Sequence, residues 1–223
     1  MVELMRSGEW LAAWVSGGLF VGGNDASVLF DAPDGAGRAL SGVGLDPDVV
    51  AFSGGRLPSV CGFNGVIAAA VARGRTRPLR VWSVLGEERA SRLVDAASAW
   101  ALPFDLVVDA EPPGACITAG SLQIDVVALR RGEVDGSMIV GVPAVGFRVR
   151  GPVDVAYVPG CGPGARALCE GAALAVVEVG VAPWPAHPER WRFSVDEAIS
   201  AARRARQVVL VGDDGSLVPS ISA

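Results

Sequence analysis

The sequence predicts an α/β protein: a four-layer αβ/βα sandwich of two mixed β-sheets with helices on the outer faces. Two observations carry this prediction. The chain passes twice from a strand-rich stretch into strand–helix units. Several of its strands are short, all-apolar runs, which are typical of strands covered on both faces. At 223 residues the chain suits one α/β domain, so we expect a single domain over 1–223.

The first half begins with strands and continues with strand–helix units. Glycine pairs at 17–18 and 22–23 indicate turns between the opening strands. The apolar run 49–52 predicts a buried strand, and the spacing of Val66, Ile67 and Ala70 predicts the helix after it. The elements expected here are strands at 2–5, 10–15, 26–30, 49–52, 79–84 and 104–108, and helices at about 64–73 and 87–100.

From residue 117 the pattern changes to alternating strands and then returns to strand–helix units. Ser194 and Glu197 have the spacing of a capping box, in which the serine bonds forward and the glutamate bonds back at the start of a helix. The elements expected here are strands at 122–127, 145–149, 153–158, 174–179 and 207–211, and helices at 165–170 and 194–206.

Charge and hydropathy restrict the partners. The net charge is −5, and no arginine-rich segment is interleaved with aromatic residues, which argues against nucleic acid. No apolar run reaches the roughly 18 residues that span a bilayer. The first residues lack the pattern of a signal peptide. We therefore expect a cytoplasmic protein with no nucleic-acid or membrane partner. The mean hydropathy of +0.41 makes a homodimer a further expectation.

Several segments resemble the metallo-β-lactamase fold, over nearly the whole chain. Residues 24–31 are similar to that family's early strand and its aspartate, here Asp31. Residues 48–66 resemble the strand, metal loop and helix around the HxHxDH motif, and 157–163 the loop that carries a bridging aspartate. Residues 194–198 resemble the helix start after another ligand histidine, and 208–212 the last strand. The resemblance implies the sandwich architecture and, in an intact member, a dinuclear metal site.

The residues aligned with the metal ligands depart from that family. Zinc sites use thiolate, imidazole and carboxylate groups, whereas a guanidinium stays protonated and repels a dication. We therefore predict no metal, no cofactor and no metal-activated water. The degenerate metal positions are Gly54, Arg56, Pro58, Ser59, Arg131, Gly160, Arg192 and Gly212.

Three of these positions hold arginine. Arg56, Arg131 and Arg192 come from separate segments that converge in the family's fold. The resemblance thus implies a pocket for a small anionic ligand, such as a carboxylate, phosphate or sulfate, held by forked hydrogen bonds. The alternative is that the guanidiniums pair with acids such as Glu178 or point into solvent.

Two of the four cysteines are candidates for a role in the same cleft. Cys61 and Cys161 lie in the loops that would face the family's metal centre. A reactive thiolate needs a cationic neighbour, for which Arg56 is available; the alternative is a small residue in a tight loop. The single histidine, His187, lies in a proline-flanked turn beside no identifiable nucleophile, so a surface position is expected.

The sequence therefore predicts a metal-independent, non-hydrolytic pseudoenzyme that binds a small anionic ligand or a protein partner at the vacated cleft. It identifies no catalytic residue. One alternative is an enzyme of another class that uses the arginines as electrostatic clamps and a cysteine or His187 as its reactive group. The other is a hydrolase by family resemblance only, against which the residues at the ligand positions argue.

Overall fold

The computed structural model describes the backbone of residues 1–54, 57–84, 88–135, 138–180, 193–212 and 214–218. Within these ranges the side chains of 57–58, 88–90, 130–135 and 138–143 lie outside the description. The chain divides into two compact units, one of residues 1–112 and 118–122 and one of 113–117 and 123–223. The two mixed sheets with their helices confirm the predicted α/β class, while a single domain over 1–223 stays a prediction.

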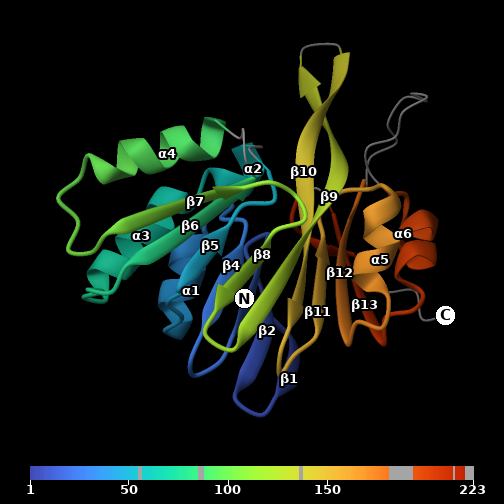
Figure 1. Ribbon diagram of the computed structural model, residues 1–223, viewed down its shortest axis with the longest axis horizontal. Coiled ribbons are helices and arrows are strands. Elements are labelled where there is room, and N and C mark those ends of the chain that lie inside the picture. Colours follow the sequence, from blue (N-terminus) through green and yellow to red (C-terminus); the bar gives the residue numbers. More distant parts are fainter. Residues whose placement is uncertain (55–56, 85–87, 136–137, 181–192, 213, 219–223) are drawn as a thin grey trace. The chain divides into compact units, whose positions relative to one another are not determined.

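The first sheet has seven strands that lie side by side in chain order (Figure 1). Strands β1 to β4 are antiparallel, and β4 to β7 are parallel. Parallel neighbours need crossover connections, which the helices of this unit supply. The strands are β1 (Val2–Ser7), β2 (Trp10–Val15), β3 (Gly18–Gly22), β4 (Ser27–Phe30), β5 (Val49–Ala51), β6 (Leu79–Val84) and β7 (Leu106–Glu111); the helices are α1 (Ala36–Val43), α2 (Leu57–Val60), α3 (Phe63–Ala72) and α4 (Glu88–Ser98).

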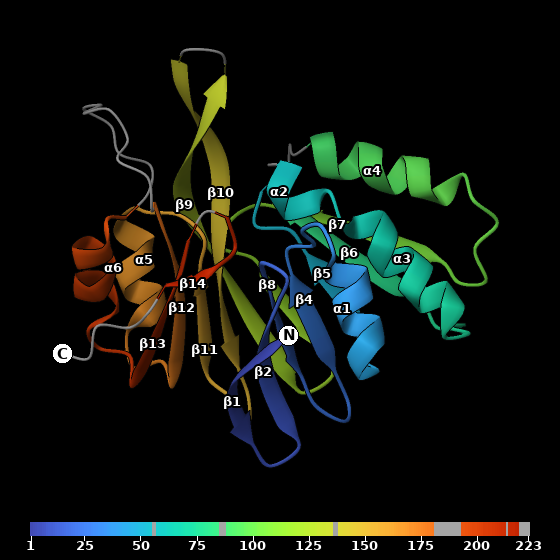
Figure 2. The same cartoon turned by 180° about the vertical axis from the view of Figure 1, so that it is seen from behind.

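Helices α1, α3 and α4 cover one face of this sheet (Figure 2). Leu40 of α1, Ile67 of α3 and Val94 of α4 belong to one buried cluster with the apolar side chains of the strands. Helices α1 and α3 cross closely because α1 has a glycine at the crossing. A Cβ atom on Gly37 would lie 2.0 Å from the carbonyl oxygen of Gly65.

The second sheet also has seven strands, in the order β14-β13-β12-β11-β10-β9-β8. Its centre is parallel, from β11 to β13, and the strands outside it pair antiparallel where their registers are defined. The strands are β8 (Cys116–Ala119), β9 (Leu122–Asp135), β10 (Met138–Arg150), β11 (Val155–Val158), β12 (Leu174–Val179), β13 (Gln207–Gly212) and β14 (Leu217–Val218); the helices are α5 (Pro163–Cys169) and α6 (Val195–Ala202).

Helices α5 and α6 lie side by side on one face of this sheet (Figure 1). Leu168 of α5 and Ala198 of α6 belong to the same buried cluster as Val177 of β12. The predicted capping box at the start of α6 is confirmed. The Ser194 amide donates to Glu197 Oε2 over 2.8 Å, and the Glu197 amide donates to Ser194 Oγ over 3.3 Å.

Strands β9 and β10 form a hairpin that continues beyond the rest of the second sheet (Figure 1). Strand β10 pairs with β11 only over 147–149, whereas its pairing with β9 begins at Met138. The sequence predicted only the ends of these strands, 122–127 and 145–149. Gly132, Gly141 and Pro143 weaken the apolar–polar alternation between them, so the pairing that continues there was not predicted.

Five further elements were not predicted: β3, α1, α2, β8 and β14. Glycines flank or interrupt the first two. Strand β3 occupies 18–22, where the glycine pairs indicated only turns. Helix α1 occupies 36–43, where two of the eight residues are glycine and no element was predicted. At Gly37 the missing side chain makes the crossing with α3 possible, so a residue with low helix propensity belongs to a packed helix.

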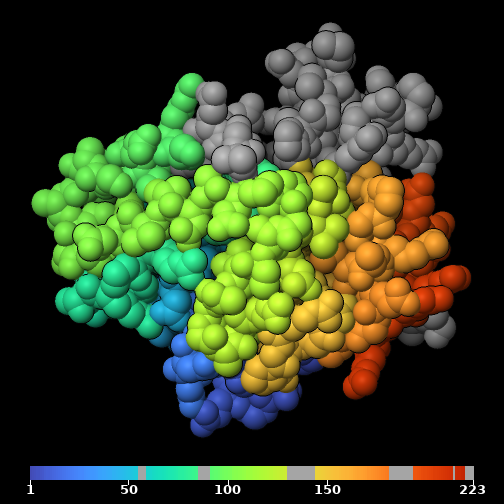
Figure 3. Space-filling view, viewed as in Figure 1, coloured from blue at the N-terminus to red at the C-terminus, as the bar shows by residue number. Residues whose placement is uncertain are grey.

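Strand β7 is an edge of the first sheet and lies at the surface, in green in Figure 3. Val107 and Val108 point to opposite faces of the strand and are 40% and 44% exposed. An uncovered edge strand is a surface on which another chain can pair; the homodimer nevertheless stays a prediction. No helix in the described part of the chain is long and apolar enough to cross a membrane.

Candidate functional site

The loop after β5, which the sequence resemblance aligns with the family's metal loop, begins with a serine that a buried aspartate holds. Asp31 follows β4 and accepts two hydrogen bonds from Ser53, from its amide over 2.8 Å and from its hydroxyl over 2.7 Å. Both residues are buried. The Asp31 backbone has a φ of 60°, which aspartate tolerates better than most residues. Its amide donates to the Ala51 carbonyl over 2.9 Å, which fixes that conformation between two parallel strands.

Backbone contacts hold the next part of this loop. The Ala32 amide donates to the Ser59 carbonyl over 2.7 Å, and the Gly62 amide donates to the Ala32 carbonyl over 2.8 Å. A Cβ atom on Gly62 would lie 1.8 Å from the Pro33 carbonyl oxygen, so this approach requires glycine. Main-chain groups therefore dock the short helix α2 against residues 32–33.

The predicted positions of the first unit divide into three groups. Gly54 and Ser59 are buried, and neither offers a charged ligand. Pro58 lies in α2, with its side chain outside the description. Arg56 lies outside the described residues. Cys61 follows α2 and is exposed, so reagents can reach it.

The predicted positions of the second unit lie at strand ends and in the hairpin. Gly160 follows β11, and Gly212 ends β13. Arg131 lies in β9 opposite Val142, and its side chain is outside the description. Arg192, like His187, lies outside the described residues. The convergence of Arg56, Arg131 and Arg192 therefore stays a prediction.

The donor groups at these strand ends do not fit a zinc or other divalent metal site. Zinc needs three or four thiolate, imidazole or carboxylate ligands. Within the described ranges no three histidine, cysteine, aspartate or glutamate side chains gather as such a site would require. Two carboxylates are buried there, Asp31 in the first unit and Glu178 in the second, and Asp31 already accepts two hydrogen bonds from Ser53.

The cysteines differ in exposure. Cys161, which follows Gly160, is half-buried, and Cys116 is exposed. Cys169 is buried at the end of α5, and this burial raises the pKa of its thiol to about 11. A thiol with so high a pKa is protonated near neutral pH, so Cys169 is a packing residue and not a nucleophile.

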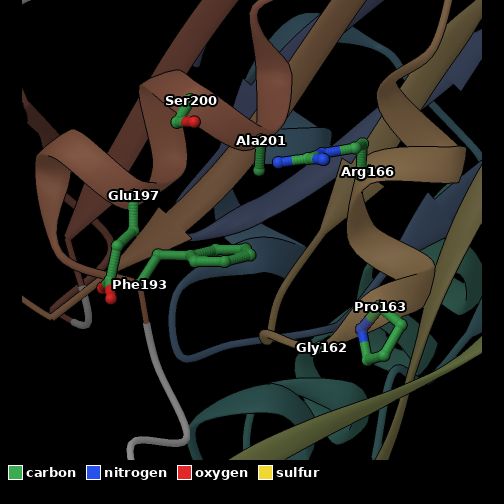
Figure 4. A pocket seen from close by; sticks show the side chains of 7 residues that line it. All are labelled: Gly162, Pro163, Arg166, Phe193, Glu197, Ser200 and Ala201. Atoms are coloured by element: carbon green, nitrogen blue, oxygen red, sulfur yellow. The ribbon is translucent and has the colours of Figure 1, made fainter.

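A pocket of about 460 Å³ lies in the second unit between α5 and α6 (Figure 4). The side chains of Arg166 and Phe193 extend into it from opposite sides, and the Glu197 carboxylate points away from the guanidinium. Among the described residues, the pocket is lined by Gly162, Pro163, Arg166, Phe193, Glu197, Ser200 and Ala201.

Sequence reasoning named Glu197 for the capping box and Phe193 as a side chain that could fill the cleft, but it predicted no pocket between these helices. Arg166 and Ser200 belong to amphipathic helices, where a polar residue ordinarily faces solvent. The available signal was the position of the loops. Gly162 and Phe193 come in the connections after the adjacent parallel strands β11 and β12, and the carboxyl ends of parallel strands are where open α/β sheets bind ligands.

Comparison with solved structures gives extensive matches at low sequence identity. The metallo-β-lactamase fold protein YhfI from Bacillus subtilis matches with a TM-score of 0.69 and 15% identity, over 88% of this chain and 77% of its own. Human tRNase Z, short form, matches with a TM-score of 0.68 and 15% identity, over 98% of this chain and 93% of its own. A diphosphatase from the PhnP family matches with a TM-score of 0.60 and 12% identity, over 89% of this chain and 72% of its own.

The sequence alone does not give such matches: no protein-family model matches it, and no curated protein matches it. The predicted resemblance is therefore confirmed at the level of the fold. The strand order of both sheets, the helices on each and the similarity to these solved structures together show that the chain has the metallo-β-lactamase fold.

Proposed function

We propose that this protein is a metal-independent member of the metallo-β-lactamase fold that binds a small anion instead of hydrolysing a substrate with a metal-activated water. The observation that carries the proposal is the residue content of the described strand ends. Serine and glycine stand at Gly54, Ser59, Gly160 and Gly212, where metal ligands would be needed. Asp31, the buried carboxylate beside this loop, accepts two hydrogen bonds from Ser53.

An anion is the ligand class that the charges favour. At the sequence level, arginine has replaced three of the eight expected metal ligands. Guanidinium groups bind carboxylates and phosphates through paired hydrogen bonds and do not bind metal cations. Two of the similar structures are a diphosphatase and a tRNase, and they share the fold with this chain. A shared fold does not imply a shared reaction when the residues of the site differ.

The test compares metals with anions on the purified full chain. Equilibrium dialysis against zinc chloride and manganese chloride is expected to leave far less than one ion per chain. Thermal unfolding is expected to shift upward with sodium benzoate or sodium phosphate, relative to sodium chloride at matched ionic strength. A ligand at a hundred times its Kd stabilises the native state by about 2.7 kcal/mol. One zinc or manganese ion retained per chain, with a hydrolytic activity that a chelator removes, would overturn the proposal.

A further inference from the structure

We propose, building on the function proposed above, that the pocket between α5 and α6 binds a monocarboxylate with a flat apolar body, with Arg166 pairing with the carboxylate and Phe193 packing on the body. The position, the charge, the walls and the size of the pocket each contribute to this inference.

The pocket lies beside the carboxyl ends of two adjacent parallel strands. Gly162 and Pro163 begin the connection from β11 into α5, and Phe193 lies beyond the end of β12. The Gly180 amide donates to the Phe193 carbonyl over 3.0 Å, and Phe193 pairs with Val179 in a parallel bridge. The chain before α6 is therefore attached to the end of β12, at the edge where open α/β sheets bind ligands.

Arg166 supplies a positive charge that no described side chain neutralises. The structure gives its guanidinium no hydrogen bond or ion pair within the described residues, although the group lines a pocket. Two other arginines of this unit are paired, Arg148 with Asp154 and Arg204 with Glu170, whereas Arg203 at the end of α6 is exposed. An arginine that faces a pocket without a partner presents its forked N–H groups to a carboxylate.

Glu197 limits the ligand to a single negative charge. Its Oε2 atom accepts the Ser194 amide over 2.8 Å as part of the capping box, so the carboxylate is held at the start of α6 and not at the guanidinium. It still lines the pocket. A single guanidinium in the described lining, with a carboxylate also present there, suits a monoanion such as a carboxylate better than a phosphate dianion.

The remaining walls suit a flat apolar body with one polar substituent. The ring of Phe193 enters the pocket opposite Arg166 (Figure 4), and Pro163 and Ala201 add apolar surface. Besides Arg166 and Glu197, the Ser200 side chain contributes a polar hydroxyl to the described lining. A volume of about 460 Å³ falls within the range of roughly 300–1,000 Å³ found for small-molecule sites.

The experiment titrates the isotope-labelled full chain with sodium benzoate and follows backbone amide shifts by NMR. Acetate has the carboxylate without the ring, benzyl alcohol has the ring without the charge, and inorganic phosphate is the dianion. Benzoate is expected to bind with a Kd on the order of 1 mM and to shift amides of 162–166 and 193–201. Acetate, benzyl alcohol and phosphate are each expected to bind these residues at least tenfold more weakly than benzoate.

Three variants locate the site. Arg166→Gln is expected to weaken benzoate binding at least tenfold, because a charge-assisted pair is lost. Ser200→Phe keeps the arginine, fills the pocket and is expected to abolish binding. Arg203→Gln is the matched control: this arginine is exposed at the end of α6, has no ion pair in the described structure and does not line the pocket. Its Kd for benzoate is expected to equal that of the unmodified chain.

The outcomes separate this inference from the function proposed above. One outcome is that the Arg166→Gln and Ser200→Phe variants keep native circular dichroism and bind benzoate as tightly as the unmodified chain. That result would overturn the assignment of the benzoate site to this pocket and would indicate an anion site elsewhere. If phosphate binds at the pocket more tightly than benzoate, the assignment of the ligand as a monocarboxylate is overturned. If neither benzoate nor phosphate binds anywhere on the chain, the pocket and the anion-binding function both fail.

Discussion

The carboxylate of Asp31 accepts both the backbone amide and the side-chain hydroxyl of Ser53, and both residues are buried. This pair joins the end of β4 to the end of β5, at the loop that the sequence resemblance aligns with the family's metal loop. Two buried intramolecular hydrogen bonds thus hold the start of this loop.

Removing the Ser53 hydroxyl tests that relationship. Ser53→Ala is expected to lower the free energy of unfolding by about 1 to 3 kcal/mol, because a buried hydrogen bond to a carboxylate is lost and one carboxylate oxygen loses that donor. Denaturant unfolding followed by tryptophan fluorescence measures the change. Ser216→Ala is the matched control, since Ser216 Oγ donates to Asp214 over 2.6 Å at an exposed turn. Equal losses in the two variants would contradict a special role for the buried pair.

Gly37 and Gly65 face each other across the crossing of α1 and α3 but differ in the space around them. A Cβ atom on Gly37 would lie 2.0 Å from the Gly65 carbonyl oxygen, whereas a Cβ atom on Gly65 would have no neighbour closer than 3.9 Å. Gly37→Ala is therefore expected to destabilise the fold by several kcal/mol, on the order of an overpacked core. Gly65→Ala is expected to stabilise it by about 0.5 to 1 kcal/mol through helix propensity. Thermal unfolding of both variants measures the difference, and a similar effect of both would contradict the close crossing.

Arg148 is buried, and its guanidinium pairs with Asp154 over 2.6 Å and donates to the Leu168 carbonyl. Asp154→Asn removes the opposing charge and is expected to lower the free energy of unfolding by about 3 kcal/mol, because it leaves a buried cation uncompensated. Asp125→Asn is the matched control.

Asp125 pairs with Arg150, which lies in β10 two residues after Arg148. The distance from Arg150 Nε to Asp125 Oδ2 is 2.7 Å, and Arg150 is exposed. Because solvent screens that pair, the expected loss is about 0 to 1 kcal/mol. Urea unfolding of the two variants gives both values. A loss at Asp125→Asn as large as that at Asp154→Asn would show that burial does not set the strength of these pairs.

Cys169 makes stability depend on pH in the alkaline range. Burial raises the pKa of its thiol from 9.0 to about 11 in the folded chain. Between these values the unfolded chain has released the proton and the folded chain has kept it, so the free energy of unfolding falls as pH rises. The expected fall attributable to this group is about 2 to 3 kcal/mol by pH 11. Below about pH 9 the group contributes no pH dependence.

The slope is measured by denaturant unfolding at a series of alkaline pH values. Cys169→Ala is expected to reduce the slope, and Cys61→Ala, at an exposed thiol, is expected to leave it unchanged. Thiol-specific reagents should modify Cys61 and Cys116 in the native chain and Cys169 only after unfolding. Rapid native labelling of Cys169 would contradict its burial.

The sequence by itself determined the fold class, and it showed which strand ends lack a metal-ligating side chain. Hydrophobic runs such as 49–52 and 174–179, and the capping box at Ser194, are local signals whose period or spacing fixes an element before any packing exists. The absence of metal-ligating groups at Gly54, Gly160 and Gly212 is likewise a property of residue type alone. Nothing that folding does can supply an imidazole there.

Only the tertiary structure decided which residues act together. The glycine at position 37 weakens a helix locally, and the contact with α3 across the core explains why it is there. Arg166 and Phe193 are separated by 26 intervening residues (193 − 166 − 1), and each has an ordinary surface or packing role in its own segment. The parallel pairing of β11 and β12 brings the ends of their connections together, and this long-range pairing, which no local pattern encodes, creates the pocket between α5 and α6.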